Sequence, residues 1–233
     1  MAVISVRSFH KKFGLKTVHQ DVTFDLHVGE CLGLIGGSGS GKSVLLRSLI
    51  GLESPDGGDI LIDNKSILNL SEDELFPVRK KVTYVFQGGA LFDSLTVFDN
   101  LAYPLREHFQ LNEEEIHAKV INKLKEFGLP NTEHLFPNAL SGGMQKRIGL
   151  ARSMMMDPEV VLYDEPTAGL DPFNTRNIQD LILQNKKNKM TSILVTHDMP
   201  VAYAVCDRMI LLKNGVITMD ESEIQKFTQG VAL

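Results

Sequence analysis

The pattern of hydrophobic and polar positions divides the chain into a strand-rich beginning, a helical middle and an end in which strands and helices alternate. Residues 3–6 and 22–26 alternate between apolar and polar side chains, which predicts two half-buried strands. Polar, glycine-containing turns at 13–14 and 28–29 follow these strands. The continuous apolar run 31–35 then predicts a strand buried on both faces.

Two more strands are expected before the helical part of the chain begins. Residues 57–59, Gly-Gly-Asp, predict a turn, and residues 60–63 predict a strand after it. Another apolar strand is expected at 82–86, where Gln-Gly-Gly ends it. We therefore expect the first 65 residues to form a small antiparallel layer around one strand-loop-helix unit.

From about residue 88 to 158 the spacing of apolar residues becomes helical. Thr96 is placed to cap one helix, which Pro104 is expected to kink or end. Asn112 caps a clearer helix, and Gly128 is a natural terminator for it. The apolar face of this second helix consists of Ile116, Val120, Leu124 and Phe127. We interpret that face as core packing in preference to a groove for a partner.

After residue 158 strands and helices alternate again. Strands are expected at 160–163 and 192–195, with a helix through 178–182 between them. Strands separated by helices imply parallel pairing through right-handed crossovers. The strand 209–212 is followed by the turn Asn214-Gly215 and a short apolar segment, which together predict a hairpin. The pattern as a whole predicts an α/β protein.

Composition and charge narrow the class of protein. With 43% apolar residues, the 233-residue chain is long enough to bury a substantial core. Its net charge of −5 argues against nucleic acid as a partner. The two cysteines, Cys31 and Cys206, form no paired motif, so we expect both to be reduced and buried. Neither a signal-peptide pattern nor an apolar run long enough for a membrane span is present, so we expect a soluble protein whose membrane role, if any, comes through a partner.

The glycine-rich stretch after the strand 31–35 carries the clearest chemistry. It reads Gly36-Gly37-Ser38-Gly39-Ser40-Gly41-Lys42-Ser43 and fits the phosphate-binding loop pattern. Glycines let successive backbone N–H groups turn toward phosphate oxygens, and the helix that follows adds unpaired N–H donors at its start. Lys42 is placed to reach the outer phosphates, and the hydroxyl of Ser43 to ligate Mg²⁺. The stretch therefore predicts a nucleotide site.

Two further motifs fit the same chemistry. Asp164 and Glu165 end a buried strand, and the carboxyl ends of parallel strands are where α/β proteins bind ligands. A phosphate-loop ATPase needs one carboxylate near Mg²⁺ and a second group for the attacking water, and this pair supplies both. Upstream, Ser141 is a good N-cap for a helix whose first residues, Gly142 and Gly143, leave its N-terminus open to an anion.

Taken in order, these motifs resemble those of an ATP-binding-cassette (ABC) ATPase over nearly the whole chain. They are the phosphate loop, Gln87 after a strand, Leu-Ser-Gly-Gly at 140–143, the strand that ends in Asp164-Glu165, Ala-Gly-Leu-Asp at 168–171 and the strand-end His197. The resemblance implies a P-loop NTPase fold with a RecA-like parallel-sheet core, an N-terminal antiparallel β layer and a helical subdomain. It implies a single ABC ATPase domain over 1–233, with the helical subdomain and its signature motif at 88–158 and the remainder, 1–87 and 159–233, as core and β layer.

The resemblance also implies cofactors and residue roles within one copy of the chain. The cofactors are ATP and Mg²⁺. Phe13 would stack on adenine, and residues 36–44, from Gly36 to Val44, would hold the phosphates. The implied catalytic set is Lys42, Gln87, Glu165 and His197, with Glu165 as the catalytic carboxylate, His197 on the γ-phosphate and Gln87 sensing Mg²⁺ and the attacking water. The implied metal-side residues are Ser43, Gln87 and Asp164.

Other implied roles require a second copy of the chain. Ser141, Gly142 and Gly143 would contact the ATP held by that copy, and Asp171 would link the two sites across the interface. The resemblance thus implies a head-to-tail dimer around two ATP molecules, with closed two-fold symmetry. An integral membrane permease is the other implied partner, with the segment 88–105 as its expected docking surface.

Two departures from the usual motifs point to a narrower subgroup. Met144 and Lys146 stand where glutamines usually follow Leu-Ser-Gly-Gly, and residues 88–97 read Gly-Gly-Ala-Leu-Phe-Asp-Ser-Leu-Thr-Val after Gln87. Both features resemble the ATPases of the Mla (maintenance of lipid asymmetry) and related Mce-type phospholipid transporters. This resemblance implies an Mce-domain lipid-binding protein and a STAS-domain protein as further partners. It also implies a peripheral location on the cytoplasmic face of the inner membrane.

Alternatives remain open at the level of sequence. An ABC importer for amino acids or other polar solutes would share every catalytic residue. A soluble ABC ATPase of DNA repair would need long coiled-coil insertions before Asp164, and one of translation would carry two cassettes per chain; the sequence shows neither. The direction of transport, the lipid head group and the coupling ratio are not determined by these motifs.

Overall fold

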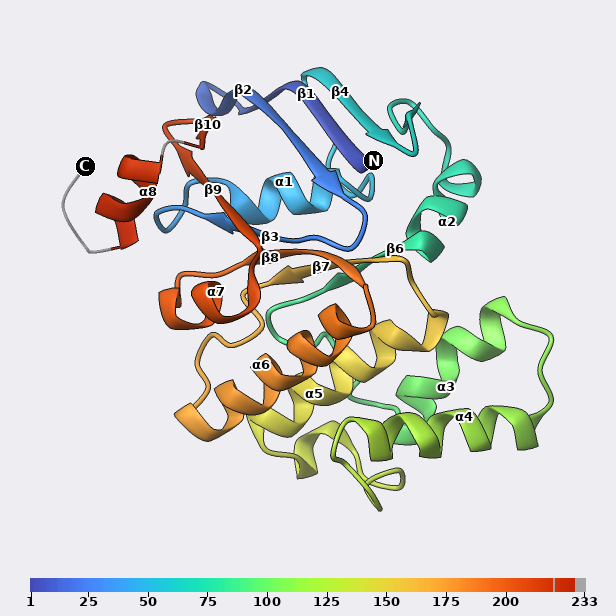
Figure 1. Ribbon diagram of the computed structural model, residues 1–233. Coiled ribbons are helices and arrows are strands. Elements are labelled where there is room, and N and C mark those ends of the chain that lie inside the picture. Colours follow the sequence, from blue (N-terminus) through green and yellow to red (C-terminus); the bar gives the residue numbers. More distant parts are fainter. Residues whose placement is uncertain (220, 229–233) are drawn as a thin grey trace.

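The computed structural model describes residues 1–219 and 221–228, and within them one 10-stranded sheet has the order β5-β4-β1-β2-β10-β9-β3-β8-β7-β6 (Figure 1). The strands are β1 Ala2–Phe13, β2 Lys16–His27, β3 Cys31–Ile35, β4 Gly57–Ile62, β5 Lys65–Ser66, β6 Val82–Val85, β7 Val160–Asp164, β8 Thr191–Val195, β9 Arg208–Lys213 and β10 Val216–Thr218. The helices are α1 Lys42–Ser48, α2 Glu72–Lys81, α3 Val97–His108, α4 Glu113–Glu126, α5 Gly142–Ser153, α6 Pro172–Lys187, α7 Met199–Val205 and α8 Glu221–Thr228. Short 3-10 helices lie at η1 Pro137–Ala139 and η2 Met154–Met156.

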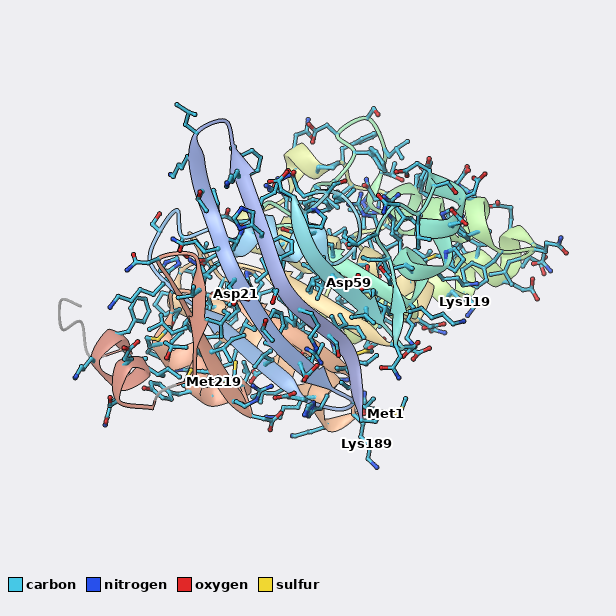
Figure 2. The ribbon with its side chains drawn as sticks, turned by 90° about the horizontal axis from the view of Figure 1, so that it is seen from above. Met1, Asp21, Asp59, Lys119, Lys189 and Met219 are labelled. Carbon is cyan, nitrogen blue, oxygen red and sulfur yellow. The ribbon has the colours of Figure 1, made fainter. Side chains whose placement is uncertain are left out.

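The sheet has an antiparallel part and a parallel part, which confirms the predicted fold class. Strand β1 pairs antiparallel with both β2 and β4. Strands β6, β7, β8, β3 and β9 pair parallel to one another and form the core. The hairpin partner β10 connects the two parts because it pairs antiparallel with β9 and parallel with β2. Seen from above, the antiparallel strands cover the upper face of the molecule, which carries Asp21 and Asp59 (Figure 2).

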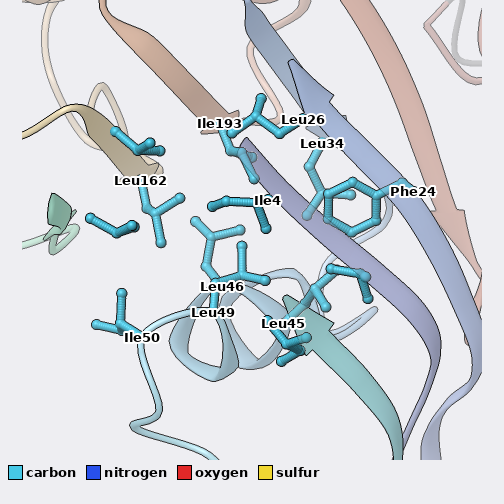
Figure 3. Packing of buried hydrophobic residues seen from close by; sticks show 14 of the residues in the cluster. Ile4, Phe24, Leu26, Leu34, Leu45, Leu46, Leu49, Ile50, Leu162 and Ile193 are labelled. Carbon is cyan, nitrogen blue, oxygen red and sulfur yellow. The ribbon is translucent and has the colours of Figure 1, made fainter. Parts of the chain in front are cut away.

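Helix α1 fills the space between the antiparallel strands and the parallel core. Leu45 and Leu46 of the helix and Leu49, which directly follows it, are buried in one cluster with residues of both parts of the sheet. Figure 3 shows this packing, with Ile4 and Phe24 from the antiparallel strands and Leu34, Leu162 and Ile193 from the core. Because α1 follows the phosphate loop directly, this packing fixes the loop at the carboxyl end of β3.

The other face of the parallel core is covered by helices. A second buried cluster joins Tyr163 of β7 to Leu101 of α3, Val120 of α4, Ile148 of α5 and Ile178 of α6. Cys31 is buried in this cluster, and Cys206 is half-buried against it, both as free thiols. Segment 88–158 contains α3, α4 and α5 and lies below the core in Figure 1. The caps expected for its helices are present, since Thr96, Asn112 and Ser141 each accept a hydrogen bond from a backbone N–H in the first turn.

Three local predictions need correction. Of the two outcomes expected at Pro104, a kink or an end, the end is wrong: helix α3 continues to His108, because Leu105 beyond the proline is buried in the second cluster. Helix α2 was not expected from the apolar spacing and contains Pro77, yet a capping box at Ser71 starts it. Residues 57–59 belong to strand β4 and not to a turn. Gly58 there has φ +84°, and a Cβ on it would lie 2.3 Å from Ser8 O of β1.

Candidate nucleotide-binding site

The phosphate loop follows β3 and is shaped by two close approaches of its backbone. Gly36 has φ +157°, and a Cβ on it would lie 2.5 Å from the carbonyl oxygen of Leu212 in β9. Gly41, at the N-cap of α1, has φ +101°, and a Cβ there would lie 2.7 Å from the imidazole of His19. Both positions therefore require glycine for space as well as for conformation. Gly37, in contrast, meets nothing within 4 Å and is exposed, so it leaves the loop open on its outer side.

Lys42 is buried inside the loop, and its ammonium group bonds to the loop itself. Its Nζ donates to Gly36 O at 2.9 Å and to Gly37 O at 3.0 Å. Burial lowers the pKa of Lys42, and the carboxylates of Glu165 and Asp164 oppose this shift. When phosphate is bound, its charged oxygens could take the place of these carbonyls as partners of the ammonium group, and the resulting hydrogen bonds would be stronger.

Asp164 at the end of β7 holds two hydroxyl groups. Ser43 Oγ donates to Asp164 Oδ1 at 2.9 Å, and Tyr84 OH donates to Asp164 Oδ2 at 2.5 Å. The carboxylate and the phenol are both buried. Burial, together with the hydrogen bond to Asp164, raises the pKa of Tyr84, so the phenol stays protonated and remains a donor. The parallel pairing of β6 with β7 brings Tyr84 to this position.

Glu165 follows in an unusual backbone conformation. Its φ is +51°, in the left-handed region that a residue with a side chain rarely adopts, and its N–H donates to Val195 O of β8 at 2.9 Å. Its carboxylate oxygen Oε2 accepts a hydrogen bond of 2.6 Å from His197 Nδ1. Only 15% of the Glu165 side chain is exposed, against 69% for His197. Strained backbone at a buried carboxylate is common at functional sites, where surrounding bonds maintain it.

One cavity of about 750 Å³ collects most of the residues singled out by the sequence. It is lined by Phe13, Lys16, Val18, Ser38, Gly39, Gly41, Lys42, Ser43, Val44, Gln87, Glu165 and His197. Phe13, at the end of β1, is 47% exposed, and the phosphate loop and Glu165 come from other elements. The cavity therefore offers an aromatic face, a phosphate cradle and a carboxylate within one space.

The signature residues lie outside this cavity and form a second surface. Ser141 and Gly142 are exposed, with Ser141 Oγ accepting from Met144 N at 3.3 Å. Asp171 caps α6, and the backbone N–H and side-chain amide of Asn174 lower the pKa of its carboxyl group. A Cβ on Gly143 would lie 2.3 Å from Asn174 Oδ1, so the starts of α5 and α6 touch. Within one copy of the chain, Ser141 and Gly142 are thus exposed on a surface that is not part of the cavity lining.

Several residues near the site were missed by the sequence analysis. Tyr84 was not distinguishable from a core aromatic, because only strand pairing reveals its carboxylate partner. His19 is buried against Gly41, and neither ring nitrogen makes a well-aligned hydrogen bond. Lys146, one of the departures from the usual motif, donates from Nζ to Ala168 O. That bond ties α5 to the segment between β7 and α6.

Comparison with known proteins supports the ABC ATPase family that the sequence motifs imply. The family described as ABC transporter matches residues 19–168. The chain is 42% identical to the probable ribonucleotide transport ATP-binding protein Mkl of Mycobacterium leprae, over 97% of this chain and 69% of that protein. It is 38% identical to the methionine import ATP-binding protein MetN of Clostridioides difficile, over 92% of this chain and 67% of that protein. The intermembrane phospholipid transport system ATP-binding protein MlaF of Escherichia coli is 34% identical, with coverage of 99% and 90%.

Solved structures of ATP-binding cassettes agree with this chain in fold. The ATP-binding cassette MJ0796, in a dimeric post-hydrolysis state bound to ADP and Pi, superposes with a TM-score of 0.85 at 32% identity and covers 92% of this chain and 96% of its own. Within residues 1–219 and 221–228, no helix has the length and apolarity of a membrane span. The chain therefore belongs to the ABC transporter family, whose ATP-binding cassettes couple ATP hydrolysis to transport.

Proposed function

We propose that this cassette hydrolyses ATP at the shared interface of a homodimer and uses the cycle to drive a permease for phospholipids. The observation that carries the catalytic part is the cavity that joins Lys42, Glu165 and His197 while leaving Ser141 on a separate surface. Glu165 would act as the base for the attacking water, and its hydrogen bond orients His197. The second copy would supply the missing donors for the γ-phosphate from its Ser141 to Gly143.

Mg²⁺ fits the oxygen donors present in the site. Ser43 and Asp164 contribute a hydroxyl and a carboxylate that are 2.9 Å apart. Mg²⁺ in nucleotide sites typically takes one or two protein oxygens, with phosphates and waters completing the shell. In the residues described by the structure no group of three His, Cys, Asp or Glu side chains could hold a metal alone, so we propose that Mg²⁺ binds together with ATP. The ion would neutralise charge on the transferred phosphoryl group.

The proposed docking surface for the permease is a groove of about 260 Å³ beside the end of β6. Its lining includes Phe86, Phe92 and Tyr103, which are between 42% and 46% exposed. The ring of Phe92 lies 5.3 Å from that of Tyr103 and 5.3 Å from the guanidinium of Arg152. Gln87 lines the nucleotide cavity and directly follows Phe86, which lines the groove. A permease helix seated in the groove would therefore contact the residue next to Gln87 in the chain. We propose segment 88–158 as the subdomain that transmits this contact.

The phospholipid assignment rests on which part of the chain resembles Mla-type ATPases. The resemblance lies in the sequence of residues 88–97, and two of these residues, Gly89 and Phe92, line the groove. Catalytic residues are common to all ABC ATPases, whereas the surface that recognises the permease determines which transport system the ATPase serves. MlaF, named for intermembrane phospholipid transport, is similar to this chain over 99% of this chain and 90% of MlaF. We therefore propose location at the inner face of the inner membrane, with Mce-domain and STAS-domain proteins as further partners.

The test is affinity purification of the tagged full chain from detergent-solubilised membranes, with mass spectrometry of proteins and lipids. The expected result is a permease and an Mce-domain protein with bound phospholipid. Recovery of an importer permease with a solute-binding protein would instead support the alternative that the similarity to MetN favours, a polar-solute importer. The matched variant is Phe92→Ser, which should lose the permease while its affinity for ATP is unchanged.

A further inference from the structure

Tyr84 is a buried tyrosine in the core strand β6 whose hydroxyl bonds to a carboxylate of the nucleotide site. Its ring belongs to the apolar cluster around α1, and the ring centroid lies 4.6 Å from that of Phe86. Only 8% of the residue is exposed, so its hydroxyl needs a partner inside the protein. That partner is Asp164 Oδ2 at 2.5 Å, a separation typical of a hydroxyl bonded to a charged oxygen. Packing alone would be satisfied by phenylalanine, so the hydroxyl calls for an explanation.

The register of β6 with β7 explains why a residue as long as tyrosine makes this contact. Tyr84 pairs with Leu162, and both lie in the same apolar cluster. Asp164 follows Leu162 by two residues, so it lies on the same face of the sheet, about 6.6 Å further along the strand. A tyrosine side chain spans that distance, whereas the hydroxyls of serine and threonine stay close to their own strand. Tyr84 therefore reaches the end of β7 from a position inside the core.

Asp164 in turn bonds to a residue that faces the cavity. Ser43 Oγ donates its proton to Asp164 Oδ1 at 2.9 Å, and Ser43 lines the nucleotide cavity. A hydroxyl has one proton and two lone pairs, so a hydroxyl that donates to a carboxylate keeps its lone pairs for a cation. The three side chains thus form a chain of hydrogen bonds from the core, through the carboxylate, to the oxygen that is proposed to bind Mg²⁺.

The phenol restricts the rotation of the Asp164 carboxylate. With Tyr84 on Oδ2 and Ser43 on Oδ1, each carboxylate oxygen has its own hydroxyl partner. Without the phenol the carboxylate loses one of the two bonds that fix its plane, so the direction of the Ser43 lone pairs is no longer fixed either. Mg²⁺ demands near-octahedral geometry and is sensitive to such a change. Groups that hold metal ligands in place typically contribute roughly 10–100-fold to metal affinity or activity.

We propose that Tyr84 is a positioning residue for the metal site: it holds Asp164, and through Asp164 the hydroxyl of Ser43, in the orientation that Mg²⁺ requires. This inference rests on the proposed joint binding of Mg²⁺ and ATP, and it adds a residue that does not line the nucleotide cavity. Tyr84→Phe should weaken metal binding by about 10-fold, because the ligands remain and only their support is lost. Nucleotide binding without metal should be unchanged, because Lys42 and the backbone of the phosphate loop are left intact.

The test measures metal binding directly on the full-length chain. Mn²⁺ serves as the probe, because it takes the same kind of oxygen ligands as Mg²⁺ and its free ion is measured by electron paramagnetic resonance. Mn²⁺ is titrated into the chain with β,γ-imido-ATP, an analogue that is not hydrolysed, with protein in excess over nucleotide. Tyr84→Phe should raise the free Mn²⁺ concentration at half-saturation by about 10-fold. Tyr84→Met, which lacks the ring as well as the hydroxyl, should show at least as large a shift.

The matched control is Tyr163→Phe on the neighbouring strand. Tyr163 is fully buried, and its hydroxyl accepts from Asn185 instead of donating to Asp164. Half-saturation of this control should stay within about threefold of the unaltered chain. Calorimetry with the same analogue in EDTA measures nucleotide binding without metal, where all chains should agree. In hydrolysis assays Tyr84→Phe should need about 10-fold more free Mg²⁺ for its half-maximal rate, with little change in the rate at saturating Mg²⁺.

The outcomes separate Tyr84 from the metal site itself. If the unaltered chain with the analogue binds Mn²⁺ no more tightly than the analogue alone, the joint binding of metal and ATP and the role of Tyr84 are both overturned. If the unaltered chain binds Mn²⁺ and Tyr84→Phe binds it with an affinity within about threefold, only the role of Tyr84 is overturned. An equal shift in Tyr163→Phe, or an equal loss of metal-free nucleotide binding in Tyr84→Phe, also overturns that role, because the effect would then be a general one.

Discussion

The hydrogen bond from Tyr84 to Asp164 gives a prediction whose magnitude can be worked out from the structure. Tyr84→Phe removes one hydroxyl and leaves the ring, which packs 4.6 Å from that of Phe86. Both partners of the bond are under 10% exposed, Tyr84 at 8% and Asp164 at 7%. A hydrogen bond to a charged group is worth about 1.5–3 kcal/mol net, and the carboxylate left behind is too buried for water to replace the phenol fully. We therefore expect Tyr84→Phe to lower the free energy of unfolding by about 2 kcal/mol.

The matched control is Tyr163→Phe on the neighbouring strand. Tyr163 is fully buried, and its hydroxyl only accepts from the neutral amide of Asn185 at 3.1 Å. Loss of a neutral hydrogen bond costs about 1 kcal/mol, so the control should be the milder of the two.

The assay is thermal unfolding of the nucleotide-free chain by differential scanning calorimetry. For a chain of this size about 1 kcal/mol lowers Tm by roughly 2–4 °C, so Tyr84→Phe should fall by about 4–8 °C and the control by about half as much. A double-mutant cycle with Asp164→Asn isolates the pair. Equal shifts for the two tyrosine variants, or no coupling in the cycle, would refute the reasoning that the charge on Asp164 makes this bond strong.

Three other predictions follow from the site. Glu165→Gln should bind ATP normally and lower steady-state phosphate release by orders of magnitude, and unchanged release would remove Glu165 from the catalytic role. Lys42→Ala should weaken ATP binding measured by calorimetry, because it removes the ammonium group that lies within the phosphate loop and bonds to its carbonyls. Wild-type affinity would contradict the assignment of this loop as the phosphate site. Burial lowers the pKa of His19 to about 4 from 6.5, so the unfolded chain takes up a proton first as pH falls. Stability should then decline from pH 6.5 to pH 4 by up to about 3 kcal/mol more than in His19→Leu, and parallel pH profiles of the two proteins would show that His19 is not buried as described.

Local signals in the sequence were sufficient for much of the fold. The caps Thr96, Asn112 and Ser141 were all identified correctly, because a capping side chain acts on the backbone only two or three residues away. The alternation of strands and helices after residue 158 likewise predicted the parallel core. Where local rules failed, as at Pro104 and in α2, burial of a neighbouring leucine outweighed the cost of a proline inside a helix.

By itself the sequence determined the family and predicted both halves of the proposed site, since the phosphate loop, the strand-end carboxylate pair and the signature helix each consist of consecutive residues. Only the tertiary structure decided how they meet. Pairing of β6 with β7 gives Asp164 its bond to Tyr84, and β9 passes so close to Gly36 that no Cβ fits there. The separation of Ser141 from the cavity is also a property of the folded surface. Such contacts join residues far apart in the chain, and no local periodicity encodes the distances between them.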